Sequence, residues 1–478
     1  MSQTPPIPEL LWNSASPELQ VLVVTLIEQN TTLQRRVADL EARLHLNSTN
    51  SSRPPSSDPP SVKRAPPRKP TGRKRGGQPG HRRHERAMVP PEQVHEVVDH
   101  KPETCEGCAH PLAGDDPEPL RHQVAEIPPF QPLVTEHRLH QLSCARCGAG
   151  TRAGLPPDVP RGAFGPRLRA VLAMLAGAYR LGKRPIRQMA LDLFGLSIST
   201  GMICKLERQC ARDLEASVAE LVDAVPDAPV VGIDETSWRE ARKKCWLWVA
   251  VTKFAVVFTV AKTRGADVAK AILGTKPGQI VISDRYPGYE WIADGRQLCW
   301  SHLRRDFQAM IDRKDEGSEA GERLLVQSDQ LFHHWHRVRD GTLSRKEFRR
   351  LAGPIRKQVR RALEAGVVSG CGSTTVTSRE LLRLEPFLWT FVEAPGVEPT
   401  NNHSEREHRH AVILRKISGG TDSESGSRFV ERILTVRATC RLQGISLLDY
   451  LMQCFEARLT GDPPPSLLVN EPPCVQGV

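Results

Sequence analysis

Residues 228–238 read APVVGIDETSW, a run of β-branched and small residues that predicts a buried strand ending at Asp234. A second apolar run, GQIVISDRYPGY at 278–289, predicts another strand that ends at Asp284. Carboxylates on adjacent strands, about 4.8 Å apart, can share a divalent cation. The alternative is that each aspartate caps a turn or a following helix.

The flanking sequence alternates between strand and helix patterns. CWLWVAVTKFAVVFTVA at 245–261 predicts two strands, and GADVAKAILG at 265–274 predicts a helix. QLCWSHLRRDF at 297–307 predicts a short strand that passes into a helix. The pattern indicates a mixed α/β block in which two strands each deliver an aspartate.

A third carboxylate is expected in TNNHSEREHR at 400–409, a polar helix start with Thr400 or Asn401 as N-cap. Helical spacing places Glu405 and Glu407 on different faces, and each face ends in an aliphatic residue. Periodicity therefore does not separate the two glutamates. Glu405 also has an ordinary alternative as the i,i+4 partner of Arg409.

Two CxxC pairs precede this block, Cys105 with Cys108 and Cys144 with Cys147. Four thiolates in two such pairs suit a closed structural Zn²⁺ site. The 35 residues between the pairs exceed the commonest spacing and predict a small ribbon with strands between the knuckles. The absence of a signal peptide or membrane span predicts a cytoplasmic protein with no membrane partner, where the twelve cysteines serve as thiols or ligands.

Three helical segments follow the cysteine pairs, at 166–182, 185–195 and 196–225. Helix, short glycine-containing turn and helix is the helix-turn-helix layout, although any small helical bundle shows the same pattern. Near the N-terminus, leucines recur every seven residues in one row and a second heptad row contains Asn30. The rows predict a parallel coiled coil and a homodimer or higher oligomer. The rows are Leu19, Leu26, Leu33 and Leu40, and Val23, Asn30, Val37 and Leu44.

The net charge of +11 is concentrated between Arg53 and Arg86, where eleven Lys and Arg residues accompany two acids. This Pro-, Ser- and Gly-rich stretch has little to bury and suits a polyanion, because phosphate contacts release counterions without a fixed shape. DNA is therefore the expected partner, and a solubilising linker is the alternative. The expected contacts in this arm are Lys74, Arg75, Arg82 and Arg83.

The ordered set of motifs resembles the insertion-sequence-66 family of bacterial DDE transposases, from about residue 19 to residue 451. The motifs are NSTNSSRPPSSD (47–58), GGQPGH (76–81), the paired CxxC, DET (234–236), SDRYPGY (283–289), CWSHLRRDF (299–307) and TNNHSER…LRK (400–416). The resemblance implies an RNase H-like catalytic core whose acidic triad is Asp234, Asp284 and Glu405. The glutamate four residues after the first asparagine of TNN is Glu405, which selects it over Glu407.

With the resemblance, the sequence predicts a multidomain α+β protein. Its expected parts are a coiled coil (1–47), a basic disordered linker (48–90), a zinc ribbon (91–160), a helix-turn-helix-like region (161–222), an RNase H-like mixed α/β catalytic domain (223–420) with a helical insertion (about 305–395), and a C-terminal helical segment and tail (421–478).

The resemblance implies a transposase that binds two Mg²⁺ or Mn²⁺ ions, cleaves element ends and transfers the 3′-OH to target DNA. Its implied partners are the element's terminal repeats, target DNA and accessory proteins of the same element. Arg406 and Arg409 are expected to contact DNA phosphates. The alternatives are an RNase H-like nuclease or resolvase, and a non-catalytic zinc and helix-turn-helix regulator.

The sequence departs from the family pattern in one segment. After LRK many members carry an aromatic pair, whereas this chain reads ISGGTDSESG at 417–426, which bears on contacts to DNA but not on the triad. Cys299 and His302 in CWSH have a zinc-like spacing. With no second ligand pair in sight, a buried cysteine beside a helix is the favoured interpretation.

Overall fold

The computed structural model describes residues 8–44, 46–51, 58, 87–128, 130–276 and 278–468. The chain falls into two compact units, Met1–Val62 with Val134–Val478, and Lys63–Leu133. The basic residues Lys74, Arg75, Arg82 and Arg83 lie outside the described residues.

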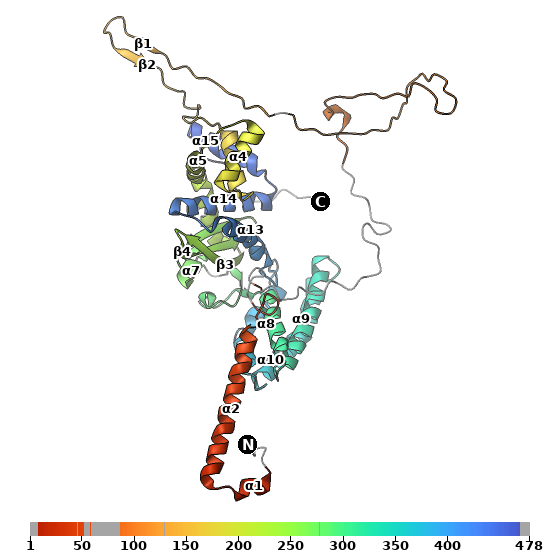
Figure 1. Cartoon of the computed structure of the whole chain (residues 1–478), viewed down its shortest axis with the longest axis vertical. Coiled ribbons are helices and arrows are strands. Elements are labelled where there is room, and N and C mark those ends of the chain that lie inside the picture. Colours follow the sequence, from red (N-terminus) through yellow and green to blue (C-terminus); the bar gives the residue numbers. More distant parts are fainter. Residues whose placement is uncertain are drawn as a thin grey trace. The chain divides into compact units, whose positions relative to one another are not determined.

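The N-terminal heptads form one long helix, α2 (Pro17–Leu44), after the short helix α1 (Glu9–Ser14) (Figure 1). The leucines of the predicted seam are exposed, Leu26 by 54% and Leu33 by 62%. The expected helix is therefore present, and the described chain leaves its apolar seam uncovered.

The described cysteine-rich residues contain a 3₁₀ turn, η2 (Pro91–Gln93), and one antiparallel hairpin, β1 (Gln141–Ser143) with β2 (Gly150–Arg152). The hairpin flanks the second knuckle. The prediction of strands between the knuckles holds only for Gln141–Ser143, because the preceding residues described from 112 to 140 form no ladder, and all of them except Gln123 are exposed.

Four helices follow, α3 (Pro166–Gly177), α4 (Lys183–Phe194), α5 (Thr200–Asp213) and α6 (Glu215–Ala224). Gly195 ends α4 with φ 63°, a left-handed conformation that glycine adopts without steric cost. The Ser199 hydroxyl then accepts the N–H of Met202 at 3.1 Å and starts α5. The segment α4–turn–α5 has the predicted helix–turn–helix order.

The central sheet has five strands in the order β5-β4-β3-β6-β7. β3 pairs antiparallel with β4, β4 pairs antiparallel with β5, and β3–β6 and β6–β7 are parallel. The 3₁₀ turn η3 (Val225–Asp227) leads into the sheet, helix α7 (Ala266–Leu273) connects β5 to β6, and the 3₁₀ turn η4 (Pro287–Tyr289) follows β6. The strands are β3 (Val230–Glu240), β4 (Lys243–Val251), β5 (Val256–Ala261), β6 (Ile280–Ser283) and β7 (Arg296–Leu298).

The prediction that the first strand ends at Asp234 is wrong. β3 continues to Glu240 because β4 pairs with it along residues 232–240, whereas β6 pairs only with residues 230–232. Asp234 therefore lies within β3, beyond the point at which its β6 neighbour stops.

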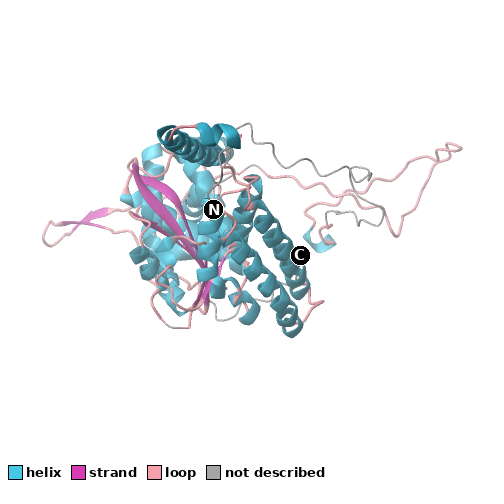
Figure 2. Ribbon diagram, turned by 90° about the horizontal axis from the view of Figure 1, so that it is seen from below, coloured by secondary structure: helices cyan, strands magenta, loops and turns pink. Residues whose placement is uncertain are grey.

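The chain downstream of β7 is helical and packs around a second hydrophobic cluster that includes Trp300, Phe307, Phe348 and Phe391. Figure 2 shows these helices beside the strands. They are α8 (Trp300–Asp312), α9 (Ser318–Arg339), α10 (Arg345–Val367), α11 (Gly372–Arg383) and α12 (Thr390–Glu393), with the 3₁₀ turn η5 (Glu385–Leu388) before α12.

The C-terminal part consists of α13 (Asn402–Ser418), α14 (Glu424–Gln443) and α15 (Leu447–Thr460). Helix α14 covers the exposed edge of β5. Every fourth side chain of α14 accepts a hydrogen bond from the free N–H of every second residue of β5. The spacings match because four residues of a helix rise about 6 Å and two residues of a strand about 6.6 Å. The bonds are Thr439 to Val256 (3.1 Å), Thr435 to Phe258 (2.9 Å) and Glu431 to Val260.

This arrangement closes a sheet edge that otherwise invites pairing with another chain. It also buries Glu431, whose pKa rises to about 7 because burial outweighs the Val260 N–H bond and the nearby charges of Arg428 and Arg432. Among the described helices, none combines the length and the apolar character that crossing a bilayer requires.

We predict that Glu431→Gln removes a pH-dependent loss of stability. The pKa of Glu431 is higher in the folded than in the unfolded chain, so its contribution to the free energy of unfolding falls as pH rises from about 4.5 to 7. The amide keeps an acceptor for Val260 and carries no charge. In urea unfolding, the free energy of unfolding of Glu431→Gln relative to that of the wild type should rise by on the order of 2 kcal/mol between pH 5 and pH 8.

Glu424→Gln, at the exposed start of the same helix, is the matched control, and its free energy of unfolding relative to the wild type should change little over this pH range. Equal pH profiles for the wild type and Glu431→Gln would contradict the prediction.

Candidate active site

Asp234 lies in β3, and Asp284 directly follows β6, the neighbouring parallel strand. The β3–β6 ladder pairs Val230 with Ile280 and Gly232 with Ile282, a constant offset of 50 residues. The same offset relates Asp234 to Asp284, which directly follows β6. The register therefore agrees with the predicted juxtaposition of the two aspartates, although the ladder stops two residues before them and β3 does not end at Asp234.

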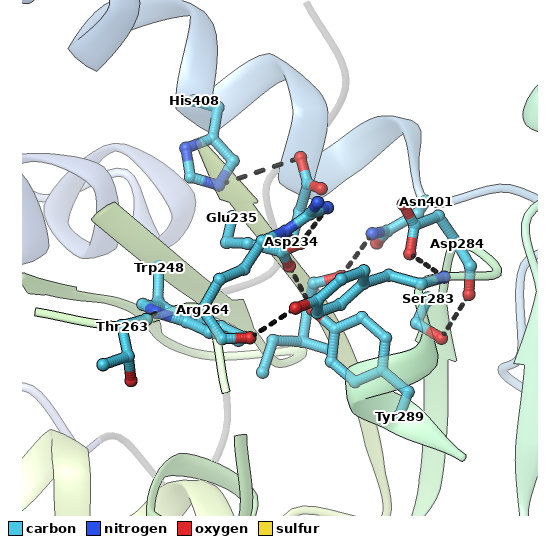
Figure 3. A network of polar contacts seen from close by, with 12 residues as sticks. Asp234, Glu235, Trp248, Thr263, Arg264, Ser283, Asp284, Tyr289, Asn401 and His408 are labelled. Carbon is cyan, nitrogen blue, oxygen red and sulfur yellow. Dashed lines mark hydrogen bonds and ion pairs between the residues drawn. The ribbon is translucent and has the colours of Figure 1, made fainter. Parts of the chain in front are cut away.

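Asn401 attaches the start of α13 to β3 (Figure 3). Its side-chain amide donates to the carbonyl of Ile233 at 2.7 Å, and its backbone N–H donates to Sγ of Cys299 at 3.2 Å. Asn401 occupies the predicted N-cap position, but its side chain bonds to the sheet and not to its own helix. The opposing strand residue is Gly232, where a Cβ would lie 2.8 Å from Asn401 Oδ1 and from Ser404 Oγ.

The two glutamates of TNNHSEREHR have different surroundings. Glu405 lies within reach of the basic side chains of α8, with Oε1 at 3.8 Å from Nε2 of His302 and Oε2 at 3.9 Å from Arg305. Glu407 is buried and forms an ion pair with Arg441 of α14. The Glu407 side chain is thus neutralised away from the aspartates, which the sequence alone did not establish.

The negative charge of the site converges on Asp234. Burial raises its pKa well above the usual value, and the charges of Glu235, Asp284 and Glu405 raise it further. Glu405 Oε1 is buried and has no hydrogen-bond partner within the described chain. Neighbouring like charges suit a divalent cation, and carboxylate oxygens are the ligands that Mg²⁺ prefers. Without an ion, oxygens of Asp234, Asp284 and Glu405 do not all lie within 4.8 Å of one another. We call Asp234, Asp284 and Glu405 the carboxylate cluster.

Glu235, next to Asp234, is already satisfied by the protein. Arg264 forms an ion pair with it at 2.5 Å, and the Tyr289 hydroxyl also donates to it (Figure 3). The Arg264 guanidinium in turn stacks on the ring of Tyr286, 3.7 Å from its centre. Glu235 therefore belongs to a buried ion pair that supports β3 and is not a free carboxylate for binding a metal ion.

Two histidines border the carboxylate cluster. His408 is buried with Nε2 at 3.7 Å from Asp234 Oδ2, and burial lowers its pKa to about 4, so it is neutral (Figure 3). Burial lowers the pKa of His302, but its hydrogen bond to Cys299 and the electrostatic influence of Cys299, Glu405 and Asp284 raise it to about 9 overall. One histidine is thus a neutral neighbour of Asp234, and the other a cation beside Glu405.

Each CxxC pair forms a tight turn in which backbone N–H groups face the first sulfur. Donors at Gly107 and Cys108 lower the pKa of Cys105, and donors at Cys147 and Arg146 lower that of Cys144. Such turns stabilise thiolates and fit a zinc ion. The two pairs belong to different compact units of the chain.

Arg406 and Arg409 lie on the exposed face of α13. Within the described chain neither forms an ion pair, and the alternative pairing of Glu405 with Arg409 is not made, because Glu405 turns towards α8. Both arginines remain available to an anionic partner.

Comparison with known families agrees with these observations. Residues 161–428, more than half of the chain, match the model described as Transposase IS66 family, and residues 102–148 match the zinc-finger binding domain of transposase IS66. This chain belongs to the IS66 family of transposases. The transposase therefore binds zinc and DNA. Residues 6–87 also match a family of unknown function, DUF6444.

The transposase is similar to three proteins of Sinorhizobium fredii that carry no assigned function. The uncharacterized protein y4qI is 26% identical over 408 residues, which is 78% of this chain and 74% of the relative. The uncharacterized protein y4hP is 25% identical over 77% of this chain and 72% of the relative. A shorter match, 25% identical over 172 residues, is with y4jO and covers 36% of this chain and 51% of the relative.

Sequence reasoning missed the supporting residues of the site. Asn401 was predicted only as a candidate N-cap, and no pattern indicated that it would bond to β3 or that His408 would lie beside Asp234. Arg264 follows β5 and Tyr289 ends η4, and the two side chains converge on Glu235. Their role depends on tertiary packing and leaves no local signal.

We predict that Gly232→Ala separates α13 from β3. The added methyl group meets Asn401 and Ser404 at 2.8 Å, so the transposase should lose about 1–3 kcal/mol of stability. Thermal unfolding measures the loss. Gly353→Ala is the control: its Cβ meets nothing within 4 Å inside α10, and alanine favours a helix. Wild-type stability in Gly232→Ala would show that the close approach is not required.

Proposed function

We propose that this transposase cleaves DNA at the ends of its element and transfers the freed 3′-OH to target DNA. The proposal has Asp234, Asp284 and Glu405 as ligands of two Mg²⁺ or Mn²⁺ ions in an RNase H-like core. The observation that supports it is that Asp284 and Glu405 lie close enough to buried Asp234 for their charges to raise its pKa, so a bound ion could draw the three carboxylates together. The sheet supports the fold assignment, since three antiparallel strands are followed by two strands parallel to the first.

The residues of the chain have distinct roles in this mechanism. The ions held by the carboxylate cluster would activate the attacking oxygen and stabilise the leaving oxygen of the phosphodiester. Asn401 sets the distance between α13 and β3, and neutral His408 packs against one oxygen of Asp234. Arg305, Arg406 and Arg409 place positive charge around the cluster, where a phosphate backbone would lie.

We further assign DNA recognition to the segment α4–turn–α5. The exposed face of α5 carries Lys205, Arg208 and Arg212. Its opposite face, which includes Ile203 and Leu206, is buried. A basic helix that follows a tight turn suits the major groove. The zinc-binding residues and the basic arm would add contacts that position the DNA.

We predict that Glu405→Gln abolishes metal-dependent cleavage, whereas Glu407→Gln does not. The first variant removes a ligand, and the second alters a carboxylate paired with Arg441 away from the cluster. The assay uses the full chain, labelled element-end DNA, accessory proteins of the element, and Mg²⁺ or Mn²⁺. Cleavage by Glu405→Gln should fall by at least about a thousandfold, the loss expected when a group acting in the transition state is removed.

The same reaction separates the alternatives. Strand joining supports a transposase mechanism, and cleavage without joining indicates a nuclease or resolvase. A metal-independent product, or equal cleavage by Glu405→Gln and the wild type, would contradict the proposal.

We also propose that α2 pairs with the α2 of a second copy as a parallel coiled coil. The exposed leucines repeat every seven residues, and a second copy presents the same seam. Light scattering of the full chain should show a dimer for the wild type and a monomer for Leu26→Asp. Val24→Asp, off the seam on the same helix, should remain dimeric. Dimeric Leu26→Asp would exclude this pairing.

A further inference from the structure

We propose that Cys299, His302 and Glu405 form a second metal site, for a thiophilic ion such as Zn²⁺, which shares Glu405 with the carboxylate cluster. One ligand atom from each of these residues lies within 4.8 Å of the others. The sequence offered only the Cys299–His302 pair, and the fold supplies the third ligand from a helix more than a hundred residues downstream. A zinc ion needs such convergence, because its tetrahedral shell draws ligands together.

The ligand atoms are available to an ion. Glu405 Oε1 is buried without a hydrogen-bond partner within the described chain and lies 3.8 Å from Nε2 of His302. The backbone N–H of Asn401 donates to Sγ of Cys299 at 3.2 Å. Backbone N–H groups also face the first sulfur of each CxxC knuckle, where they favour the thiolate that binds zinc. Cys299 shares one feature with the knuckles, a backbone N–H that faces its sulfur.

The local backbone keeps the site in place. Cys299 directly follows β7 and is the N-cap residue of α8, and its N–H donates to the carbonyl of Ser283 at 2.9 Å. His302 lies one turn further on the same helix. Asn401 links Cys299 to the start of α13, so a single peptide group connects the sulfur to the helix that carries Glu405.

The donor set decides which ion is bound. A thiolate, an imidazole and one carboxylate suit Zn²⁺ or Co²⁺, whereas Mg²⁺ prefers oxygen ligands. Three protein ligands leave a fourth position open, as in exchangeable zinc sites. Binding releases the protons that the cysteine and histidine carry.

The shared ligand makes the two sites compete. A zinc ion that engages Glu405 removes a ligand from the carboxylate cluster, and Mg²⁺ in the cluster draws Glu405 away from Cys299. We therefore expect excess zinc to switch off DNA cleavage. Binding of the thiophilic ion stands on the contacts above, and only this competition rests on the proposed function.

Cobalt binding tests the site without any activity measurement. Full-length protein, purified with zinc in its knuckles, is titrated with Co²⁺ while the thiolate-to-cobalt charge-transfer band is recorded. The wild type should bind one Co²⁺ with this band. Cys299→Ser should lose it, and Cys204→Ser, a half-buried cysteine of α5, should keep it.

His302→Gln provides a second variant if Cys299→Ser fails to fold, and it should weaken cobalt binding by more than about tenfold. No charge-transfer band in the wild type would overturn the site. An undiminished band in Cys299→Ser would also overturn it.

A cleavage assay tests the competition. Zinc is added to Mg²⁺-supported cleavage, and each rate is compared with the zinc-free rate of the same variant. The wild type should be inhibited at zinc concentrations at least tenfold below those that inhibit Cys299→Ser. Equal sensitivity would contradict the competition. A wild type that never cleaves would refute the proposed function, and the cobalt titration would still decide the metal site.

Discussion

The hydrogen bond from the side chain of Asn401 to the carbonyl of Ile233 holds the candidate active site together. It joins α13 to the strand position that precedes Asp234, and it forms only because Gly232 leaves room for the helix. Asp234 and Asp284 are brought together by strand pairing, but Glu405 comes from a helix 121 residues beyond Asp284 in the sequence. Without this contact the third carboxylate has no fixed relation to the other two.

The close approach concentrates charge that the chain only partly neutralises. Glu235 and Glu407 are each paired with an arginine, whereas burial and neighbouring carboxylates raise the pKa of Asp234. Such a cluster is destabilising until a cation binds, and this is a common arrangement in sites that bind metals for catalysis. The backbone N–H of Asn401 also donates to Cys299, so the same residue ties the start of α13 to the Cys299–His302 side of the site.

The sequence predicted much of this architecture because its signals are local. The β-branched runs at 230–233 and 280–283, the glycine turn at 195 and the leucine heptads each correspond to a strand, turn or helix of the structure. The end of the strand at Asp234 was misjudged, because β4 extends β3 through pairing that no local pattern reveals.

The supporting residues were not predictable for a related reason. Threonines at 435 and 439 look like ordinary helix residues, and their bonds to β5 exist only because α14 runs along that edge. Likewise, periodicity left Glu405 and Glu407 equivalent. Family resemblance distinguished them first, and the structure separates their surroundings through Arg441 on one side and α8 on the other.

The central claim is that the carboxylate cluster of Asp234, Asp284 and Glu405 is a divalent-cation site. Crystals of the full chain grown with Mn²⁺ test it directly, because manganese gives an anomalous signal that locates the ion. Anomalous density is expected within about 2.1–2.3 Å of an oxygen from each of the three carboxylates. Ordered carboxylates with no anomalous density among them, at saturating Mn²⁺, would contradict it.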